Sequence, residues 1–217
     1  MPKSSNNITD ILFDLGNVLV PFDWDIAFRR LLPILPPDLA RLLTENKRAF
    51  KQLFLKHSLA LEVGEIDFES FCRIISETLR IQLNVDEFRV IWCDIFRIDE
   101  EMVALGECLS KNYRTWLVSN TCRAHYDWIV EHFPRVAFYR MAALSFELAV
   151  MKPSPAYYEK AIEMFGIDPA SSVFIDDLWE NVQGAERSGI RGILYSGRFQ
   201  LIQDLVSLGV KVRGYGE

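Results

Sequence analysis

The chain has 217 residues, of which 50% are hydrophobic, and its formal net charge at pH 7 is -6. This length is enough for one sizeable hydrophobic core with an inserted subdomain. The acidic balance argues against a nucleic-acid partner, because such binding needs a basic face that neutralises phosphates.

No segment predicts targeting to a membrane or export. Residues 1–10 are polar and lack the apolar core of a signal peptide, and charged residues interrupt every later apolar stretch. The cysteines form no C-x-x-C pair, and the three histidines are too scattered for a zinc site. We therefore expect a cytoplasmic protein with reduced thiols and neither a membrane nor a nucleic-acid partner.

The first part of the chain predicts one strand followed by a long helical insert. Residues 8–13 form an apolar run typical of a buried strand, and Leu15-Gly16-Asn17 indicates a turn. Helical periodicity follows at residues 26–32, 39–55, 68–79 and 88–96. This insert is too long for a simple crossover between strands. We predict a helical cap over residues 22–109, inserted into a core made of residues 1–21 and 110–217.

Strands and helices alternate in the rest of the chain. The predicted strands are residues 115–118, 136–143, 172–175 and 192–195. The predicted helices between and after them are residues 124–132, 154–165, 181–188 and 199–208. Such alternation is typical of βαβ units, so the fold class is α/β with a Rossmann-like parallel sheet.

Polar residues follow three of the apolar runs. Asp14 ends the first strand, Ser119-Asn120 ends the second, and Asp176-Asp177 follows a later one, while Lys152 precedes a proline. Each has an ordinary structural explanation as a turn, cap or loop residue. Ligands of open parallel sheets bind beyond the carboxyl ends of the strands, where distant residues meet. Carboxylates, a hydroxyl and an ammonium in one crevice indicate a divalent metal ion and phosphate.

These segments, in this order and spacing, resemble the haloacid dehalogenase (HAD) superfamily, whose members are mostly Mg²⁺-dependent phosphatases with a cap. Phe13-Asp14-Leu15-Gly16-Asn17-Val18-Leu19 and Asp176-Asp177-x-x-x-Asn181 are similar to one branch of it. That branch holds bacterial sugar-phosphate phosphatases of the glucose-1-phosphate type and the phosphatase domain of soluble epoxide hydrolase. Met151-Lys152-Pro153 followed by Tyr157-Tyr158, and Val63-Gly64-Glu65-Ile66 in the cap, also fit it.

The resemblance implies a role for each motif residue. Asp14 would be the nucleophile that forms an aspartyl-phosphate. Mg²⁺ would be held by Asp14, the Gly16 carbonyl and Asp177. Asp176 and Asn181 would support the metal site.

The same resemblance implies a phosphate site. Ser119 and the Asn120 backbone would bind phosphate oxygens, and Lys152 would offset negative charge. Arg123 and His125 follow this motif and are candidate substrate contacts, with an exposed helix start as the alternative.

One position departs from the pattern of the superfamily. Most of its phosphatases carry a second Asp two residues after the nucleophile, which protonates the leaving oxygen, and here that residue is Gly16. Losing such a group typically lowers a rate by about 10²–10⁴-fold. Asp23 and Asp25 are candidate substitutes for this acid, and the alternative is that one of them caps the first helix of the cap.

We predict a Mg²⁺-dependent phosphomonoester hydrolase acting on a small phosphorylated metabolite, with sugar phosphates as the leading class. One alternative is a 2-haloacid dehalogenase, in which the same Asp attacks carbon, although Asp177 argues against it. The other is a catalytically weak or inactive module that binds a phosphate ligand or a protein. Only Gly16 supports that alternative.

Overall fold

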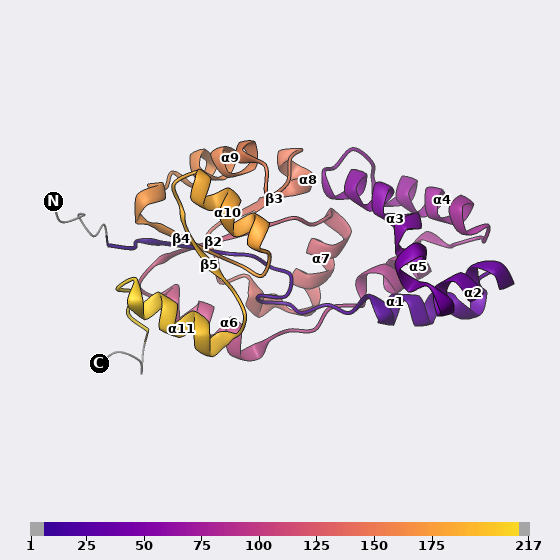
Figure 1. The fold of residues 1–217 in the computed structure, drawn as a ribbon, viewed down its shortest axis with the longest axis horizontal. Coiled ribbons are helices and arrows are strands. Elements are labelled where there is room, and N and C mark those ends of the chain that lie inside the picture. The colour runs from indigo at the N-terminus through magenta and orange to yellow at the C-terminus, as the bar shows by residue number, and fades with distance from the viewer. Residues whose placement is uncertain (1–6, 213–217) are drawn as a thin grey trace.

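The structure, a computed structural model, describes residues 7–212 and consists of an α/β core beside a helical cap (Figure 1). Five parallel strands form one sheet in the order β3-β2-β1-β4-β5. The strands are β1 (Asp10–Phe13), β2 (Arg114–Ser119), β3 (Ala142–Leu144), β4 (Ser172–Asp176) and β5 (Arg191–Leu194). The predicted fold class is therefore confirmed.

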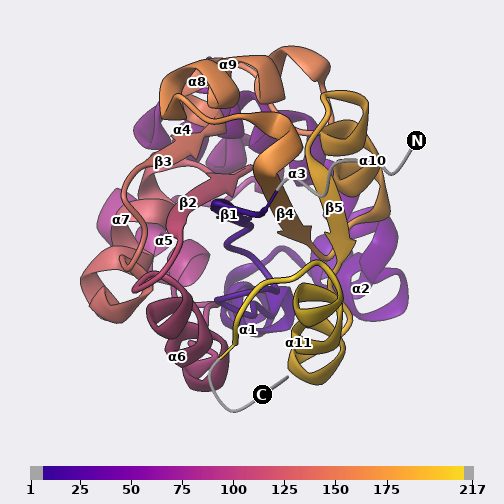
Figure 2. The same cartoon turned by 90° about the vertical axis from the view of Figure 1, so that its left-hand side faces the viewer.

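Helices cover both faces of the sheet (Figure 2). Alternate residues of the strands point to opposite faces, so Phe13 and Ile175 belong to one hydrophobic cluster while Leu12 and Phe174 belong to another. The first cluster includes residues of α6 (Glu100–Leu109), α7 (Arg123–His132) and α11 (Arg198–Ser207). The second includes residues of α9 (Pro155–Phe165) and α10 (Trp179–Arg187). Among residues 7–212, no helix is long and apolar enough to cross a membrane.

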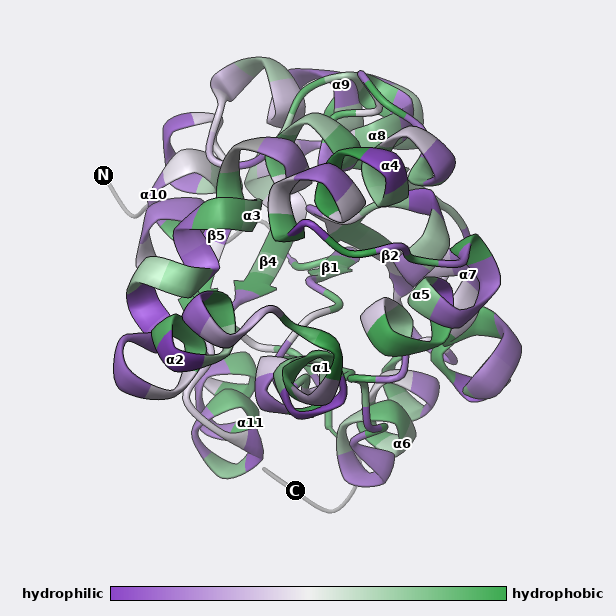
Figure 3. Ribbon diagram, turned by 90° about the vertical axis from the view of Figure 1, so that its right-hand side faces the viewer, coloured by the Kyte–Doolittle hydropathy of each residue, from purple (hydrophilic) through white to green (hydrophobic). Residues whose placement is uncertain are grey.

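The cap has its own hydrophobic core. Its helices are α1 (Trp24–Leu31), α2 (Pro37–Glu45), α3 (Lys47–Glu62), α4 (Phe68–Leu79) and α5 (Val85–Cys93). Their buried faces meet around Phe50, Phe71, Phe88 and Trp92. Figure 3 looks onto the cap and shows hydrophobic and hydrophilic residues mixed along these helices. That pattern is expected of amphipathic helices that bury one side.

Two predicted elements differ from the structure. The single helix predicted over residues 39–55 is wrong, because Asn46 ends α2 and its side chain accepts a hydrogen bond from Ala49 N at 3.0 Å to begin α3. The strand predicted over residues 136–143 is also wrong in extent. A 3₁₀ turn occupies Pro134–Val136, and the strand begins only at Ala142.

The chain enters and leaves the cap through two adjacent segments. Phe22 pairs with Phe96 in an antiparallel bridge, and Arg97 N donates to Pro21 O at 2.8 Å. Beyond this crossing, Met102 and Val103 of α6 are buried in the same cluster as β1. The first predicted boundary, at residue 21, stays a prediction. For the second, we propose residue 96 in place of 109.

A glycine in the turn after α3 lies against the core. Gly64 has φ +74°, and a Cβ at this position would lie 2.4 Å from the Phe146 carbonyl oxygen. Gly166 also has positive φ, +59°, but a Cβ there would meet open space. The two glycines therefore differ mainly in how closely another part of the chain approaches them.

We predict that Gly64→Ala lowers the free energy of unfolding more than Gly166→Ala does. Each substitution lowers the free energy of unfolding by about 1–2 kcal/mol, because it places a Cβ on a residue in the left-handed region. Gly64→Ala lowers the free energy of unfolding by about 1–3 kcal/mol more, because the Phe146 backbone must move. Urea denaturation of the two variants and the parent protein measures this difference, and equal losses would contradict the close contact.

Candidate active site

A buried lysine lies at the centre of the predicted site. Lys152 Nζ is 2.8 Å from Asp14 Oδ1, 2.6 Å from Asp176 Oδ2 and 3.0 Å from the Val118 carbonyl oxygen. An ammonium has three N–H donors, and each has an acceptor here. Burial alone lowers the pKa of Lys152, but the two carboxylates outweigh burial, so its pKa lies above the ordinary value. Lys152 is therefore a charged group that joins β1, β2 and β4.

Sheet topology brings the two carboxylates together. β1 lies between β2 and β4, and Phe13 pairs with Ile175 in the parallel register. Asp14 N donates to Ile175 O at 2.9 Å, so Asp14 and Asp176 follow adjacent strand ends. The strand order reverses between β1 and β4, which is where open α/β sheets bind ligands.

Three carboxylates converge at this point. Asp14, Asp176 and Asp177 each offer an oxygen atom, and these atoms lie within 4.8 Å of one another. Burial raises the pKa of Asp14 to about 7, with Lys152 opposing the rise and Asp176 adding to it. Burial also raises the pKa of Asp177. Three carboxylates beside one ammonium leave an excess of negative charge, which fits a divalent cation with oxygen ligands.

The neighbouring aspartates have different surroundings. Asp176 accepts hydrogen bonds from Leu178 N at 2.8 Å and from Asn181 Nδ2 at 3.0 and 3.1 Å, in addition to the one from Lys152. Asp177 is half-buried, and its Oδ2 accepts from Asn17 Nδ2 at 3.0 Å. Both oxygens of Asp176 are thus engaged within the protein, which leaves Asp177 better placed to bind a cation.

Ser119 and Asn120 follow β2 on the other side of Asp14. Ser119 is buried, and both residues line a cavity of about 90 Å³ that Gly16 also lines. The Asn120 side chain accepts from Lys152 N at 2.8 Å and donates to Lys152 O at 2.9 Å. The sequence had indicated only a backbone role for Asn120. Its side chain also holds the Lys152 backbone in place.

The aspartates considered as substitutes for the missing acid have partners in the cap. Asp23 is exposed and caps α1 by accepting from Asp25 N at 2.9 Å. Asp25 pairs with Lys47 Nζ at 2.6 Å. Asp23 therefore caps the first helix of the cap, as the alternative interpretation predicts.

His125 lies deeper than an exposed helix start would place it. Its side chain is buried, its Nε2 is 3.1 Å from the Trp92 carbonyl oxygen, and its ring stacks on Trp92. Burial lowers the pKa of His125 to about 4. It lines the cavity beside Ser119 as a neutral ring.

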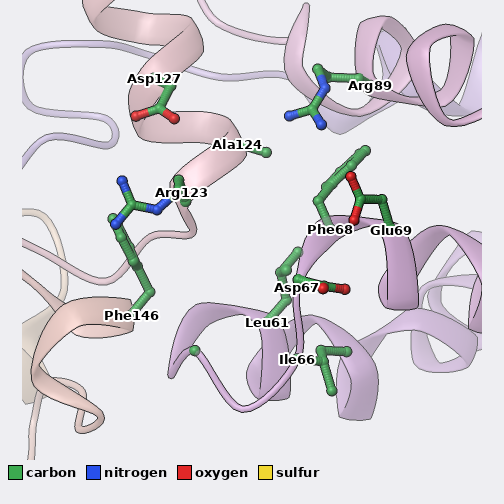
Figure 4. Close-up of a pocket in the computed structure, with 11 residues that line it drawn as sticks. Leu61, Ile66, Asp67, Phe68, Glu69, Arg89, Arg123, Ala124, Asp127 and Phe146 are labelled. Carbon is green, nitrogen blue, oxygen red and sulfur yellow. The ribbon is translucent and has the colours of Figure 1, made fainter.

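Arg123 lines a different cleft (Figure 4). Its guanidinium lies 4.8 Å from the Phe146 ring centroid and 3.4 Å from Glu147. The cleft has a volume of about 530 Å³ and lies between cap and core, and neither Asp14 nor Ser119 lines it. The structure therefore does not bring Arg123 together with the carboxylate cluster.

Glu62, the last residue of α3, lines the cavity beside Gly16 and Ser119, although sequence reasoning did not name it as a site residue. Its sequence context favours a solvated turn, with a cap loop that faces the site and binds sugar hydroxyls as the alternative. Burial raises the pKa of Glu62 to about 7. No local pattern marks this residue, because its position depends on how the cap meets the core.

A family model of haloacid dehalogenase-like hydrolases matches residues 11–189. The chain belongs to this family. It is 24% identical over 191 residues to the D-ribitol-5-phosphate phosphatase of Bacteroides thetaiotaomicron, covering 84% of this chain and 89% of that protein. The predicted superfamily is thus confirmed, and the protein is an HAD-like hydrolase.

Solved structures agree with this assignment. An HAD family enzyme from Bacteroides thetaiotaomicron, in complex with magnesium and inorganic phosphate, matches with a TM-score of 0.76 and 26% identity, over 88% of this chain and 96% of that one. L-2-haloacid dehalogenase from Xanthobacter autotrophicus matches with a TM-score of 0.61 and 16% identity, over 97% and 91% of the two chains. The second match shows a shared fold only.

We predict that His125 makes stability depend on acid pH. Its pKa is about 4 when folded, against an ordinary value of 6.5, so the unfolded chain binds the proton first. The resulting stability is present above pH 6.5 and is lost as pH falls toward 4. Between pH 7 and pH 4, the wild type should lose about 3 kcal/mol more unfolding free energy than His125→Gln. Urea denaturation at both pH values measures this, and parallel pH profiles would contradict it.

Proposed function

We propose that the protein is a Mg²⁺-dependent phosphomonoester hydrolase that acts on a small phosphorylated metabolite. The observation that carries this proposal is the grouping of Asp14, Asp176 and Asp177 around Lys152 at the end of β1 and β4. Two similar proteins support this proposal. One is named as a phosphatase of a polyol phosphate, and the other has been solved with magnesium and phosphate.

Asp14 is the nucleophile in this proposal. Lys152 binds its Oδ1, so Oδ2 is the oxygen that attacks phosphorus. An aspartyl-phosphate forms as the ester P–O bond breaks, and water then attacks the same phosphorus and restores the carboxylate. Lys152 favours the ionised form of Asp14 and would offset negative charge on the phosphoryl group.

Residues that flank Asp14 would hold the cation and the phosphate. The Asp14 and Asp177 carboxylates, with the Gly16 carbonyl, would hold Mg²⁺, which supplies positive charge against the phosphoryl oxygens when bound. On the β2 side, the Ser119 hydroxyl and the Asn120 N–H near the start of α7 would bind phosphate oxygens. Asp176 and Asn181 would hold the loop that carries Asp177.

The cavities favour a small leaving group. The cavity beside Gly16 has a volume of about 90 Å³, and a second of about 210 Å³ extends into the cap. Trp24 and Glu62 line both. We propose a sugar or polyol phosphate, whose hydroxyls would meet Glu62 and the neighbouring polar groups.

We predict that Asp14→Asn abolishes Mg²⁺-dependent phosphate release. Polyol and sugar phosphates, nucleotides and an aryl phosphate would be tested with Mg²⁺ or a chelator. The substitution should lower kcat/KM by at least about 10³-fold, since it removes the nucleophile. Asp127→Asn, which alters an exposed aspartate on α7, is the matched control and should keep full activity.

Release of phosphate from no substrate would refute the proposal. Halide release from a 2-haloacid without Mg²⁺ would then identify a dehalogenase. Tight binding of a phosphate ester, with release of neither phosphate nor halide, would identify a binding module.

We also predict that Mg²⁺ stabilises the folded protein. A ligand at 100 times its dissociation constant adds about 2.7 kcal/mol to the free energy of unfolding. Asp177→Asn should remove most of this gain, because it takes away one of the carboxylate ligands. Asp127→Asn should retain it. Thermal denaturation with Mg²⁺ and with chelator measures the effect, and equal Mg²⁺ stabilisation of Asp177→Asn would contradict the assigned ligand.

A further inference from the structure

The position that usually carries the proton donor has no side chain in this protein, and an aromatic ring lies close to it. A Cβ on Gly16 would lie 3.1 Å from Cε1 of Phe22, so the Phe22 ring fills the space beside this glycine. Asp23 and Asp25, which follow in the chain, are held by the α1 cap and by Lys47. Other titratable groups that line the cavity are therefore the candidates for protonating the leaving oxygen.

The cavity beside Gly16 and Ser119 has only two titratable side chains among its described lining residues, Glu62 and His125. His125 is unsuitable at neutral pH. Its lowered pKa keeps the ring neutral, and its Nε2 is engaged with the Trp92 carbonyl oxygen. Glu62 is the remaining candidate.

The end of α3 is fixed against the loop that follows Ser119. Ser145 Oγ donates to the Glu62 carbonyl oxygen at 2.6 Å and accepts from Thr121 N at 2.9 Å. Two residues later, Gly64 lies against the Phe146 backbone. One hydroxyl thus links the backbone of Glu62 to the proposed phosphate-binding loop.

The Glu62 carboxyl has no fixed partner. Among the side chains described between residues 7 and 212, none donates a hydrogen bond to it or forms an ion pair with it. Lys51, on α3, lines the adjoining cavity with Glu62, and its Nζ lies 5.7 Å from the Phe28 ring centroid. Cys122 and His125 face it from the core. Cys122 is a protonated thiol because burial raises its pKa to about 12, and His125 is neutral.

We propose that Glu62 donates a proton to the leaving oxygen and then, as a carboxylate, accepts one from the attacking water. This inference rests on the proposed phosphatase function. In the first step the Asp14–phosphorus bond forms, the ester P–O bond breaks, and the Glu62 proton passes to the alcohol. In the second step water attacks phosphorus, its proton returns to Glu62, and Asp14 and phosphate are released.

The electrostatic surroundings agree with this double role. A group that donates and accepts protons in turn works best when its pKa lies near the working pH. Burial raises the pKa of Glu62 from 4.5 to about 7. Near neutral pH both of its protonation states are therefore well populated.

The test compares two leaving groups in Glu62→Gln and in the matched control Glu65→Gln, which alters an exposed glutamate of the same turn. An alkyl phosphate, such as a polyol phosphate, needs protonation of its leaving oxygen, whereas a nitrophenyl phosphate does not. Glu62→Gln should lower kcat/KM for the alkyl ester by about 10²–10⁴-fold and change that for the aryl ester by less than about tenfold. The alkyl-to-aryl ratio is independent of the fraction of folded protein.

The second step gives a separate signal. With the aryl ester, Glu62→Gln should show a burst of nitrophenol followed by slow turnover, because the aspartyl-phosphate forms but lacks a base for hydrolysis. The wild-type kcat/KM for the alkyl ester should fall above pH about 7 as Glu62 loses its proton. This fall should be absent in Glu62→Gln and present in Glu65→Gln.

Two outcomes would overturn the inference while leaving the phosphatase proposal intact. One is an unchanged alkyl-to-aryl ratio in Glu62→Gln. The other is an equal loss for both esters through KM alone, which would mean that Glu62 only binds substrate. A wild type without Mg²⁺-dependent release would refute the phosphatase proposal itself, and this inference would fall with it.

Discussion

The site depends on placing one ammonium between two buried carboxylates. Asp14 and Asp176 follow adjacent strands, and without a cation their mutual repulsion and burial would favour protonation of one of them. Lys152 contacts both, and its third donor bonds to β2. Removing one partner of a buried charge cluster typically costs about 3–5 kcal/mol. The same contact that holds the strand ends together therefore favours the ionised form of the proposed nucleophile.

This arrangement also explains why consecutive aspartates differ. Asp176 is committed to Lys152, Asn181 and the Leu178 backbone, so it has little freedom to follow a changing ligand shell. Asp177 is half-buried, and its side chain accepts from one amide, that of Asn17. Two ionised carboxylates and one ammonium leave one net negative charge, and an ionised Asp177 adds another, which would favour a divalent cation in the proposed metal site. One aspartate supports the loop, and the next is left for binding.

Much of the site could be predicted from the sequence because parallel topology gathers strand ends. Asp14, Ser119 and Asp176 needed only a correct assignment of apolar runs to strands. Residues whose positions depend on distant contacts could not be predicted in this way. His125 is buried because the cap places Trp92 against it. Glu62 enters the cavity because Ser145, more than eighty residues later, binds its backbone.

Errors in the predicted elements have a similar origin. The apolar periodicity of residues 39–55 continues through Asn46, but its side chain caps α3 more effectively than it extends a helix. The helix α6 follows the cap helices in the chain and, like them, buries apolar residues such as Met102 and Leu109. Periodicity does not specify which core a helix packs against. The crossing of Phe22 and Phe96, which is a long-range pairing, supplies that information.

A proton donor on the cap changes what cap movement does. An acid two residues after the nucleophile would be present whether the cap is docked or not, because both would be on one loop. Glu62 is instead held over the site by two cap–core contacts, from Ser145 to its carbonyl and from Gly64 to the Phe146 backbone. In the proposed mechanism, docking of the cap would exclude water and strengthen the electrostatic contribution of Lys152. The same docking would bring the proposed proton donor to the proposed nucleophile, so an undocked enzyme would have a nucleophile but no group to protonate an alkyl leaving group.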